Sequence, residues 1–365
     1  MPLPERFREP RSLVLIVAAA VVALSLVVWL IVAVVVPTVD NAQCSGVEFG
    51  APVVKTAGAA SGTPPIGGGA FAGRVRSLFR GGGSVVYCHD FADPFVLREG
   101  GSYFAYSTNT GNEHVPVLTA GGLFGTAKRS DVLPKLPVWS APGYVWAPSV
   151  LPRPGGYVLY YTTRSASTGA QCVSYALGKN PGGPFVDSST GPMVCPAGGG
   201  AIDPDPFVAA DGRVYLLWKN YDGQTGIMGQ ELSADGRTLT GPAQLLAPAG
   251  QPWEAGVVEA PTMLANGGNY YLFYSGNDWK TANYATSYAV CTSPLGPCTK
   301  PNPEPWLTSS PTAQGPGSPS VFTDEHGNTW LALHSWVKGK VGYPQGARSL
   351  FVVRFALVNG RPVLT

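Results

Sequence analysis

Five segments of this chain repeat one pattern, and their regular spacing restricts the fold more than any other feature. Each segment starts with a polar or small residue before a proline, continues as an apolar run, turns at glycine and ends in an aromatic run, as in ADPFVLREGGSYFAYS and EAPTMLANGGNYYLFYS. Successive prolines are separated by 54, 56, 57 and 58 residues, and they are Pro94, Pro148, Pro204, Pro261 and Pro319.

Each repeat has the pattern of a β-hairpin, because its two runs flank a turn such as Gly267-Gly268 that supplies positive φ angles. Strand units repeated at this period are typical of propeller blades. We therefore predict an all-β fold, a five-bladed β-propeller over residues 84–365. A two-sheet sandwich is the alternative, but it gives no reason for five nearly equal periods.

An uncharged apolar run from Leu13 to Val36 lies ahead of the repeats. At ~1.5 Å per residue it is long enough to cross the ~30 Å core of a bilayer as one helix. The arginines before it favour a cytoplasmic N-terminus, so the propeller is expected outside the cytoplasm, tethered to the cell membrane by a single transmembrane helix. A signal peptide cleaved before secretion is the alternative, although its apolar core is normally only ~7–15 residues long.

The chain is thus predicted to have a cytoplasmic stub at 1–12, a transmembrane anchor at 13–36, a Gly/Ala/Pro-rich linker at 37–83 and the propeller. The formal charge of +2 indicates no nucleic-acid partner. All six cysteines lie beyond the anchor, which fits disulfides in an oxidising compartment. Pairing sequence neighbours gives Cys172–Cys195, Cys291–Cys298 and Cys44–Cys88.

Three carboxylates stand where the repeats begin. In a propeller the first residues of every inner strand surround the central axis, so equivalent positions of different blades meet at one mouth. Converging carboxylates with no lysine or arginine beside them in sequence suit glycosidic-bond hydrolysis, in which one acid protonates the leaving oxygen while another group activates water or attacks carbon. The residues directly before the prolines are Asp93, Ala147, Asp203, Ala260 and Ser318, with Glu259 one residue earlier in the fourth repeat.

The starts of these repeats resemble glycoside hydrolase family 43, whose members act mainly on arabinofuranosides and xylosides. The resemblance implies a glycosidase that cleaves furanosyl or pentosyl bonds in a polysaccharide or oligosaccharide, arabinan-like first and xylan-like second, with inversion of configuration. It covers about residues 87–362, and the matching pieces are ADPF at Ala92–Phe95, WAPSV at Trp146–Val150, IDP followed by DG at Ile202–Gly212, VEAPTM and YYLFYSGN within Val258–Asn277, and NGRPV at Asn359–Val363.

Carried over by position, the resemblance implies that Asp93 is the general base, Glu259 the general acid, and Asp203 a third carboxylate with the role of pKa modulator. An inverting pair lies ~6.5–9.5 Å apart, which leaves room for a water molecule. Two of these assignments have rivals. Asp205 takes the place of Asp203 if the strand is counted back from its aromatic end, and Glu254 lies in the loop before Glu259.

Several further side chains are candidates for the sugar pocket. Trp146 begins the second repeat and can stack on the C–H face of a sugar, while Trp279 lies in a loop of the kind that shapes subsites. Arg348 is expected to contact substrate or to pair with an acidic residue. His89 and Asp205 complete the candidate substrate-binding residues.

His334 ends the aromatic run of the fifth repeat, in LALHSW. The family resemblance places a histidine near the central channel, close to a bound calcium ion or its water shell. A core histidine that donates to a backbone carbonyl is the structural alternative. Calcium prefers oxygen ligands, so His334 is expected to be a minor participant in an ion site, and the hydrolysis itself requires no cofactor.

Two other functions fit parts of the pattern. A non-catalytic propeller that binds glycan or a partner protein has the same fold, but the three carboxylates argue against it. A related five-bladed enzyme that retains configuration would differ in the anomer that forms first.

Overall fold

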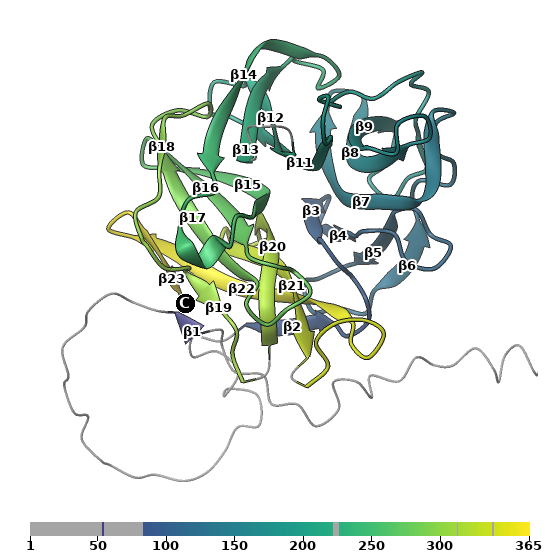
Figure 1. The fold of residues 1–365 in the computed structure, drawn as a ribbon. Helices are drawn as coiled ribbons and strands as arrows, with labels where there is room; N and C mark the ends of the chain where they lie inside the picture. The colour runs from purple at the N-terminus through teal and green to yellow at the C-terminus, as the bar shows by residue number, and fades with distance from the viewer. Residues whose placement is uncertain (1–52, 55–82, 222–225, 312, 338) are drawn as a thin grey trace, which may run out of the picture. The chain divides into compact units, whose positions relative to one another are not determined.

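The five repeats fold into five antiparallel sheets that follow one another around a central axis (Figure 1). The structure is a computed structural model, and it describes residues 53–54, 83–221, 226–311, 313–337 and 339–365. This arrangement confirms the predicted all-β five-bladed propeller. The first strands of the blades contact one another in turn and close an inner ring, formed by β3 (Phe95–Glu99), β7 (Ser140–Arg153), β11 (Ala201–Val208), β15 (Val258–Asn266) and β20 (Ala313–Thr323).

Further strands extend the first three blades outward from the axis. In blade 1 they are β4 (Ser102–Tyr106), β5 (Pro116–Ala120) and β6 (Lys128–Asp131); in blade 2, β8 (Gly156–Ser165), β9 (Gln171–Gly178) and β10 (Phe185–Val186); in blade 3, β12 (Val214–Asn220), β13 (Gly226–Leu232) and β14 (Leu239–Pro248).

The last two blades recruit strands from outside their own repeats. Blade 4 contains β16 (Asn269–Gly276), β17 (Ala285–Cys291), β18 (Cys298–Thr299), β19 (Leu307–Thr308) and β1 (Val53–Val54). Blade 5 contains β21 (Thr329–Val337), β22 (Arg348–Val358), β23 (Arg361–Leu364) and β2 (Ser84–Tyr87). Because β2 precedes blade 1 in the chain but pairs with β22, backbone hydrogen bonds close the ring. The pairing of β1 with β19 also means that two residues of the predicted linker belong to a sheet.

Apolar clusters fill the space between neighbouring blades, one for each of the five pairs. In β8, Leu159 and Tyr161 pack toward blade 1, whereas Val158 and Tyr160 pack toward blade 3. This burial on both faces follows from the period of two in a strand. It explains why the second strand of a repeat is uniformly apolar and aromatic, since each such buried side chain stabilises the fold by about 1.5–3 kcal/mol.

Two of the predicted disulfides are present, Cys172–Cys195 and Cys291–Cys298. Cys88 is also disulfide-bonded. Cys44 lies outside the described residues, so its pairing stays a prediction.

The predicted cytoplasmic stub at 1–12 and anchor at 13–36 fall outside the described residues as well. Within the part of the chain that the structure describes, no helix is long and apolar enough to cross a membrane. A short 3-10 turn, Pro252–Glu254, leads into β15.

Candidate active site

The residue before each repeat proline has a left-handed backbone conformation. We call these five residues the axial ring; their φ angles lie between 44° and 57°, and they are Asp93, Ala147, Asp203, Ala260 and Ser318. Such a conformation costs a residue other than glycine about 1–3 kcal/mol, so five copies at one level of the propeller need a structural reason. In blades 2 to 5 the pairing register of the inner strand shifts at the same place. These β-bulges re-aim the side chains at the strand ends.

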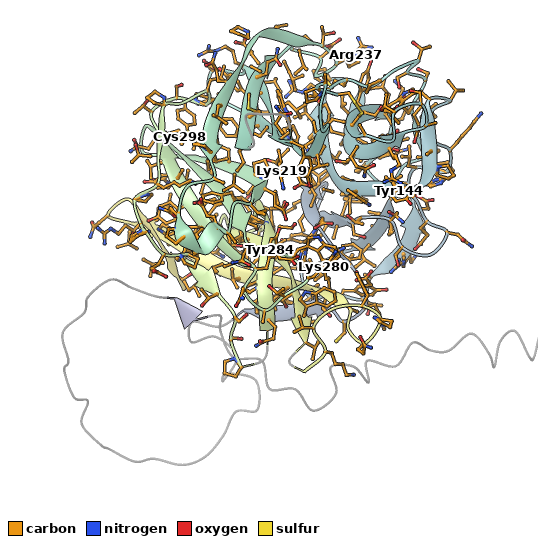
Figure 2. The ribbon with its side chains drawn as sticks, viewed as in Figure 1. Tyr144, Lys219, Arg237, Lys280, Tyr284 and Cys298 are labelled. Atoms are coloured by element: carbon orange, nitrogen blue, oxygen red, sulfur yellow. A yellow bond between two sulfur atoms is a disulfide. The ribbon has the colours of Figure 1, made fainter. Side chains whose placement is uncertain are left out.

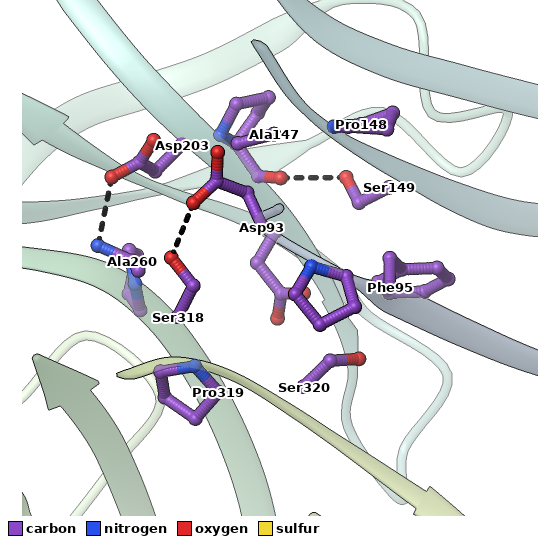
Figure 3. Close-up of a pocket in the computed structure, with 14 residues that line it drawn as sticks. Asp93, Phe95, Ala147, Pro148, Ser149, Asp203, Ala260, Ser318, Pro319 and Ser320 are labelled. Atoms are coloured by element: carbon purple, nitrogen blue, oxygen red, sulfur yellow. Dashed lines mark hydrogen bonds between the residues drawn. The ribbon is translucent and has the colours of Figure 1, made fainter. Parts of the chain in front are cut away.

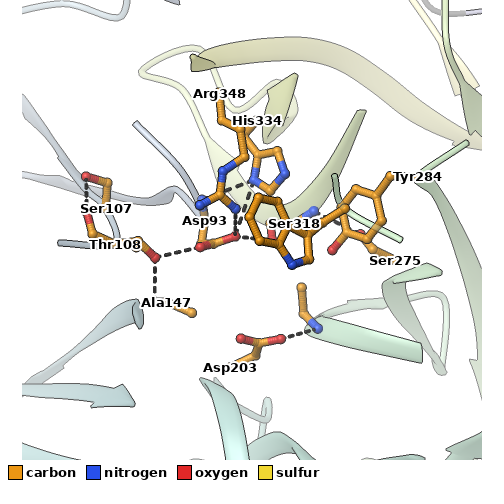
Figure 4. Close-up of polar contacts among 12 residues, drawn as sticks. Asp93, Ser107, Thr108, Ala147, Asp203, Ser275, Tyr284, Ser318, His334 and Arg348 are labelled. Carbon is orange, nitrogen blue, oxygen red and sulfur yellow. Dashed lines mark hydrogen bonds and ion pairs between the residues drawn. The ribbon is translucent and has the colours of Figure 1, made fainter. Parts of the chain in front are cut away.

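The backbone N–H of each axial-ring residue donates a hydrogen bond to the preceding blade. Figure 4 shows the bond from Ala147 to Thr108. In blade 4, Ala260 donates to Oδ2 of Asp203 at 2.9 Å. In blade 3 the residue at the end of the second strand, which pairs with Ile202, is Lys219. It cannot accept this bond because its ammonium group has no acceptor atom. In the other four blades the acceptor is a side chain at the end of the second strand: His334 Nδ1 for Asp93 (3.1 Å), Thr108 Oγ1 for Ala147 (3.0 Å), Thr162 Oγ1 for Asp203 (3.1 Å) and Ser275 Oγ for Ser318 (2.8 Å).

A pocket of about 280 Å³ opens over the axial ring, and the three predicted carboxylates Asp93, Asp203 and Glu259 all line it. The predicted substrate-binding residues Trp146, Trp279 and Arg348 line the same pocket. The structure therefore brings together residues that lie more than 250 positions apart in the chain, such as Asp93 and Arg348. The remaining lining residues are Thr108, Ile202, Tyr221, Tyr284 and Ser318.

Asp93 is surrounded by groups that favour its ionised form. Oδ1 accepts a hydrogen bond from Ser318 Oγ at 2.8 Å and lies 3.5 Å from Nη1 of Arg348. Oδ2 accepts a hydrogen bond from Thr108 Oγ1 at 2.5 Å. Burial acts to raise the pKa of Asp93, but the charge of Arg348, the contact with His334 and the hydrogen bond from Thr108 outweigh it and hold the pKa well below its ordinary value. A carboxylate that is ionised at neutral pH is able to accept a proton from water.

The pKa of Asp203 is shifted in the opposite direction. Burial, followed by the charges of Glu259 and Asp93, raises the pKa of Asp203 well above its ordinary value. A proton on Asp203 removes the repulsion that a third negative charge would cause in the pocket. The Ala260 N–H, which donates to Asp203, comes from the residue directly after Glu259, so it fixes the two side chains relative to each other.

Both carboxyl oxygens of Glu259 have partners. Nζ of Lys219 donates to Oε2 at 2.8 Å, and the hydroxyl of Tyr284 donates to Oε1 at 2.8 Å. The side chains of Lys219 and Glu259 are 4% and 11% exposed, so this ion pair is almost closed to solvent. Burial acts to lower the pKa of Lys219, but the charge of Glu259 outweighs it and the pKa is raised. Lys219 and Tyr284 both lie toward the middle of the propeller (Figure 2).

Indole rings form part of the pocket wall. Trp279 stacks on Trp336 with 6.3 Å between ring centroids and 13° between ring planes, and the Trp336 indole N–H donates to the Trp279 carbonyl oxygen at 2.9 Å. The guanidinium carbon of Arg348 lies 4.4 Å from the Trp279 ring centroid. Trp146 lines the pocket as well. Flat apolar faces next to charged groups suit a sugar, which presents both C–H faces and hydroxyls.

Three residues considered from the sequence lie away from this pocket. Asp205 lines a second, smaller cavity of about 30 Å³, whose wall includes all five axial-ring residues (Figure 3), and burial raises the pKa of Asp205 to about 8. His89 packs edge-on against a tyrosine ring and does not line the pocket. Glu254 is fully buried and pairs with Lys300 at 2.5 Å. The bulge at the start of β11 separates Asp203, which lines the pocket, from Asp205, which does not.

His334 is fully buried beside Asp93. Its Nδ1 accepts the Asp93 N–H, and burial lowers the pKa of His334, which favours a neutral ring that carries its proton on Nε2. Among the described residues this Nε2 has no hydrogen-bond partner. A protonated Nε2 can donate to a water molecule but cannot bind a cation directly.

The predicted calcium ion finds little support in these groups. Among the described residues, no group of three or more His, Cys, Asp or Glu side chains could hold a metal ion. Calcium takes about six to eight oxygen ligands, so the site around His334 fits a buried water better than an ion. Calcium in the central channel stays a prediction, with a water molecule as the link to His334.

Thr108 and Tyr221 line the pocket and were not predicted from the sequence, and neither was Lys219, which pairs with Glu259. A signal for Thr108 and Lys219 exists, because the ends of the second strands can be aligned across the repeats. That alignment places a hydroxyl or imidazole acceptor at four blades and a lysine at one, the residues being Thr108, Thr162, Lys219, Ser275 and His334.

One sugar-sized pocket of the propeller contains a carboxylate that stays ionised, another that stays protonated and a glutamate fixed by two donors. These are the features of a glycosidase. The comparison with protein families agrees and is more specific. The model of the glycosyl hydrolases family 43 matches residues 83–362, and the chain belongs to this family.

Individual relatives support the same assignment. The chain is 27% identical over 269 residues to the beta-D-galactofuranosidase xynD of Aspergillus niger, covering 69% of this chain and 76% of the relative. It is 28% identical over 217 residues to the extracellular endo-alpha-(1->5)-L-arabinanase 1 of Bacillus subtilis, covering 56% of this chain and 66% of the relative. The crystal structure of a thermostable family-43 glycoside hydrolase superposes with a TM-score of 0.68 at 25% identity, covering 76% of this chain and 93% of that one.

Proposed function

We propose that the protein hydrolyses glycosidic bonds of furanosyl or pentosyl residues, arabinan-like in the first place and xylan-like in the second, by a single inverting displacement. The observation that carries this proposal is the different environment of the three carboxylates in one pocket. Arg348 keeps Asp93 ionised, while Asp203 retains a proton next to Glu259. The names of the two relatives, a galactofuranosidase and an arabinanase, support the substrate class.

In the proposed reaction Asp93 accepts a proton from a water molecule, and the water oxygen attacks the anomeric carbon. Glu259 gives its proton to the glycosidic oxygen as the bond from that oxygen to the anomeric carbon breaks. The products are a sugar of inverted configuration and a free hydroxyl on the leaving group. Transfer of the proton from Asp93 to solvent, and from solvent to Glu259, restores the starting state.

The test is release of reducing ends from linear arabinan and from xylan by the wild-type protein and by Glu259→Gln. We expect the substitution to reduce kcat by about 10²–10⁴-fold, the usual contribution of a general acid. Glu99→Gln, at an exposed position on β3, is the matched control and should keep wild-type activity. Unchanged activity of Glu259→Gln would contradict the assignment of the acid. No hydrolysis of any glycan by the wild type would favour a glycan-binding propeller instead.

Proton NMR of the first product distinguishes inversion from retention. An inverting enzyme releases first the anomer opposite to that of the substrate, and mutarotation then produces the other anomer. Initial release of the substrate's own anomer would assign a retaining mechanism and would make one carboxylate the nucleophile.

We also propose that the enzyme works outside the cytoplasm on a cell-envelope or captured glycan, tethered to the membrane by residues 13–36. The support is the uncharged apolar run and the basic flank before it. Activity that stays with the membrane fraction after a high-salt wash, and is accessible to added arabinan in intact cells, is the expected result. Activity found in the culture medium would favour the cleaved signal peptide.

A further inference from the structure

Lys219 departs from a pattern that the other four blades share. At the end of the second strand each of those blades carries a side chain that accepts the N–H of the next axial-ring residue. A lysine cannot do this, and Asp203 accepts the Ala260 N–H in its place. Blade 3 therefore gives up the acceptor at the end of its second strand and gains a buried cation next to Glu259.

The buried cation is directed at the predicted acid. Nζ of Lys219 donates to Oε2 of Glu259 at 2.8 Å, and it also lies 4.3 Å from the ring centroid of Tyr221. The second oxygen of Glu259 accepts from the hydroxyl of Tyr284, whose ring stacks on His334 at 5.7 Å between centroids. Two donors on two different blades thus fix the plane of the Glu259 carboxyl group.

The other groups around Glu259 are neutral or negative. Tyr221 and Tyr284 have pKa values raised first by burial, so their hydroxyls stay protonated. Asp203 keeps its proton and is neutral, and the negative charge of Asp93 is already balanced by Arg348. Lys219 therefore supplies the positive charge that is in direct contact with Glu259.

We propose that Lys219 is a positioning residue for acid catalysis, which orients the Glu259 carboxyl group and stabilises the carboxylate left when its proton passes to the glycosidic oxygen. This inference rests on the proposed function. In that step the O–H bond of Glu259 breaks, the proton binds the leaving oxygen, and the negative charge remains on Glu259 beside the Lys219 ammonium. Stabilisation of a charge that develops in the transition state lowers the barrier, whereas uniform binding does not.

The inference predicts a dependence on the leaving group. An unactivated sugar alcohol needs full protonation to leave, so its cleavage depends on the stability of the Glu259 carboxylate. A 4-nitrophenolate leaves with little protonation and should hardly depend on it. A role of Lys219 in folding alone would reduce cleavage of both substrates by the same factor.

The experiment compares full-length wild type, Lys219→Met and Lys219→Arg on an arabino-oligosaccharide and on the matching 4-nitrophenyl arabinofuranoside. For Lys219→Met we expect kcat/KM to fall by about 10²-fold on the oligosaccharide and by less than about 10-fold on the aryl glycoside. Lys219→Arg should recover most of the oligosaccharide activity. Lys179→Met, at an exposed lysine of blade 2, is the control.

Equal losses on both substrates would overturn the inference. If Lys219→Met does not fold, Lys219→Thr takes its place, because threonine is the ring acceptor that blade 2 uses at Thr162. The proposed function fails separately: it is contradicted if Glu259→Gln keeps full activity. If Lys219→Met keeps the wild-type kcat/KM on both substrates while Glu259→Gln is inactive, the role of Lys219 is contradicted and the proposed function is not.

Discussion

Nη1 of Arg348 lies 3.5 Å from Oδ1 of Asp93, and the two residues stand at opposite ends of the propeller's sequence. Arg348 begins β22 in blade 5, while Asp93 precedes β3 in blade 1. The contact exists because β2 pairs with β22 and closes the ring between the first and last blades. Closure of the fold thus places the cation that keeps the predicted base ionised.

Replacing Arg348 with Gln should narrow the pH range of activity from the acid side. Burial raises the pKa of Asp93 and Arg348 lowers it, so loss of the guanidinium raises that pKa. Asp93 in the variant is then protonated at a higher pH than in the wild type, and the protonated form cannot act as a base. The acid limb of kcat/KM should move upward by about 1–3 pH units, measured on an aryl arabinofuranoside. Arg354→Gln, at a half-buried arginine of the same strand that donates to Thr365, is the control.

Substitution of Glu254 should reduce stability, whereas substitution of Glu259 should reduce catalysis. Glu254 is fully buried, where it accepts hydrogen bonds from the Gly250 N–H and the Tyr274 hydroxyl and pairs with Lys300. Glu254→Gln breaks this buried pair and should lower the free energy of unfolding by about 3–5 kcal/mol, while the folded protein keeps its kcat. Glu259→Gln should lose kcat and keep its melting temperature within a few degrees. Urea unfolding and kcat are measured on both variants. A loss of kcat in Glu254→Gln and a loss of stability in Glu259→Gln would contradict these assignments.

Thr162 should be needed for the axial ring. Its hydroxyl is buried and accepts the Asp203 N–H at 3.1 Å, so Thr162→Val leaves that backbone donor without this acceptor. We expect the free energy of unfolding to fall by about 1–3 kcal/mol, and kcat to fall because Asp203 loses its orientation. Thr119→Val, at a half-buried threonine of β5 outside the ring, is the control. Equal stability of the two variants would mean that the ring hydrogen bonds do not hold the left-handed conformation.

The periodic parts of this protein could be predicted from the sequence because they are local. The interval between prolines determined the number of blades, and the residues before those prolines are the ones that surround the axis. The choice between Asp203 and Asp205 could not be made with certainty, because counting from either end of the strand gives a different register. A bulge between Ile202 and Asp205 determines that only Asp203 lines the pocket.

The cations of the pocket are harder to foresee. No lysine or arginine stands beside the three carboxylates in the sequence, yet Lys219 reaches Glu259 from β12 and Arg348 reaches Asp93 from β22. Both contacts are set by pairing between strands and by closure of the ring, which no local pattern encodes. An alignment of the five second-strand ends would have marked Lys219 as the exception.

The two described disulfides should differ in what they contribute to stability. Cys172 and Cys195 are 23 residues apart, whereas Cys291 and Cys298 are 7 apart. A longer closed loop restricts the unfolded chain more, so the loop-entropy relation gives about 3.4 kcal/mol for the first bridge and about 2.5 kcal/mol for the second. Cys172 and Cys291 are both fully buried, which makes the local packing costs of substitution similar. Urea unfolding of Cys172→Ala/Cys195→Ala should therefore show a larger loss than that of Cys291→Ala/Cys298→Ala, with kcat unchanged in both. A larger loss from the short bridge would show that packing between blades 3 and 4, where Cys291 lies, outweighs loop entropy.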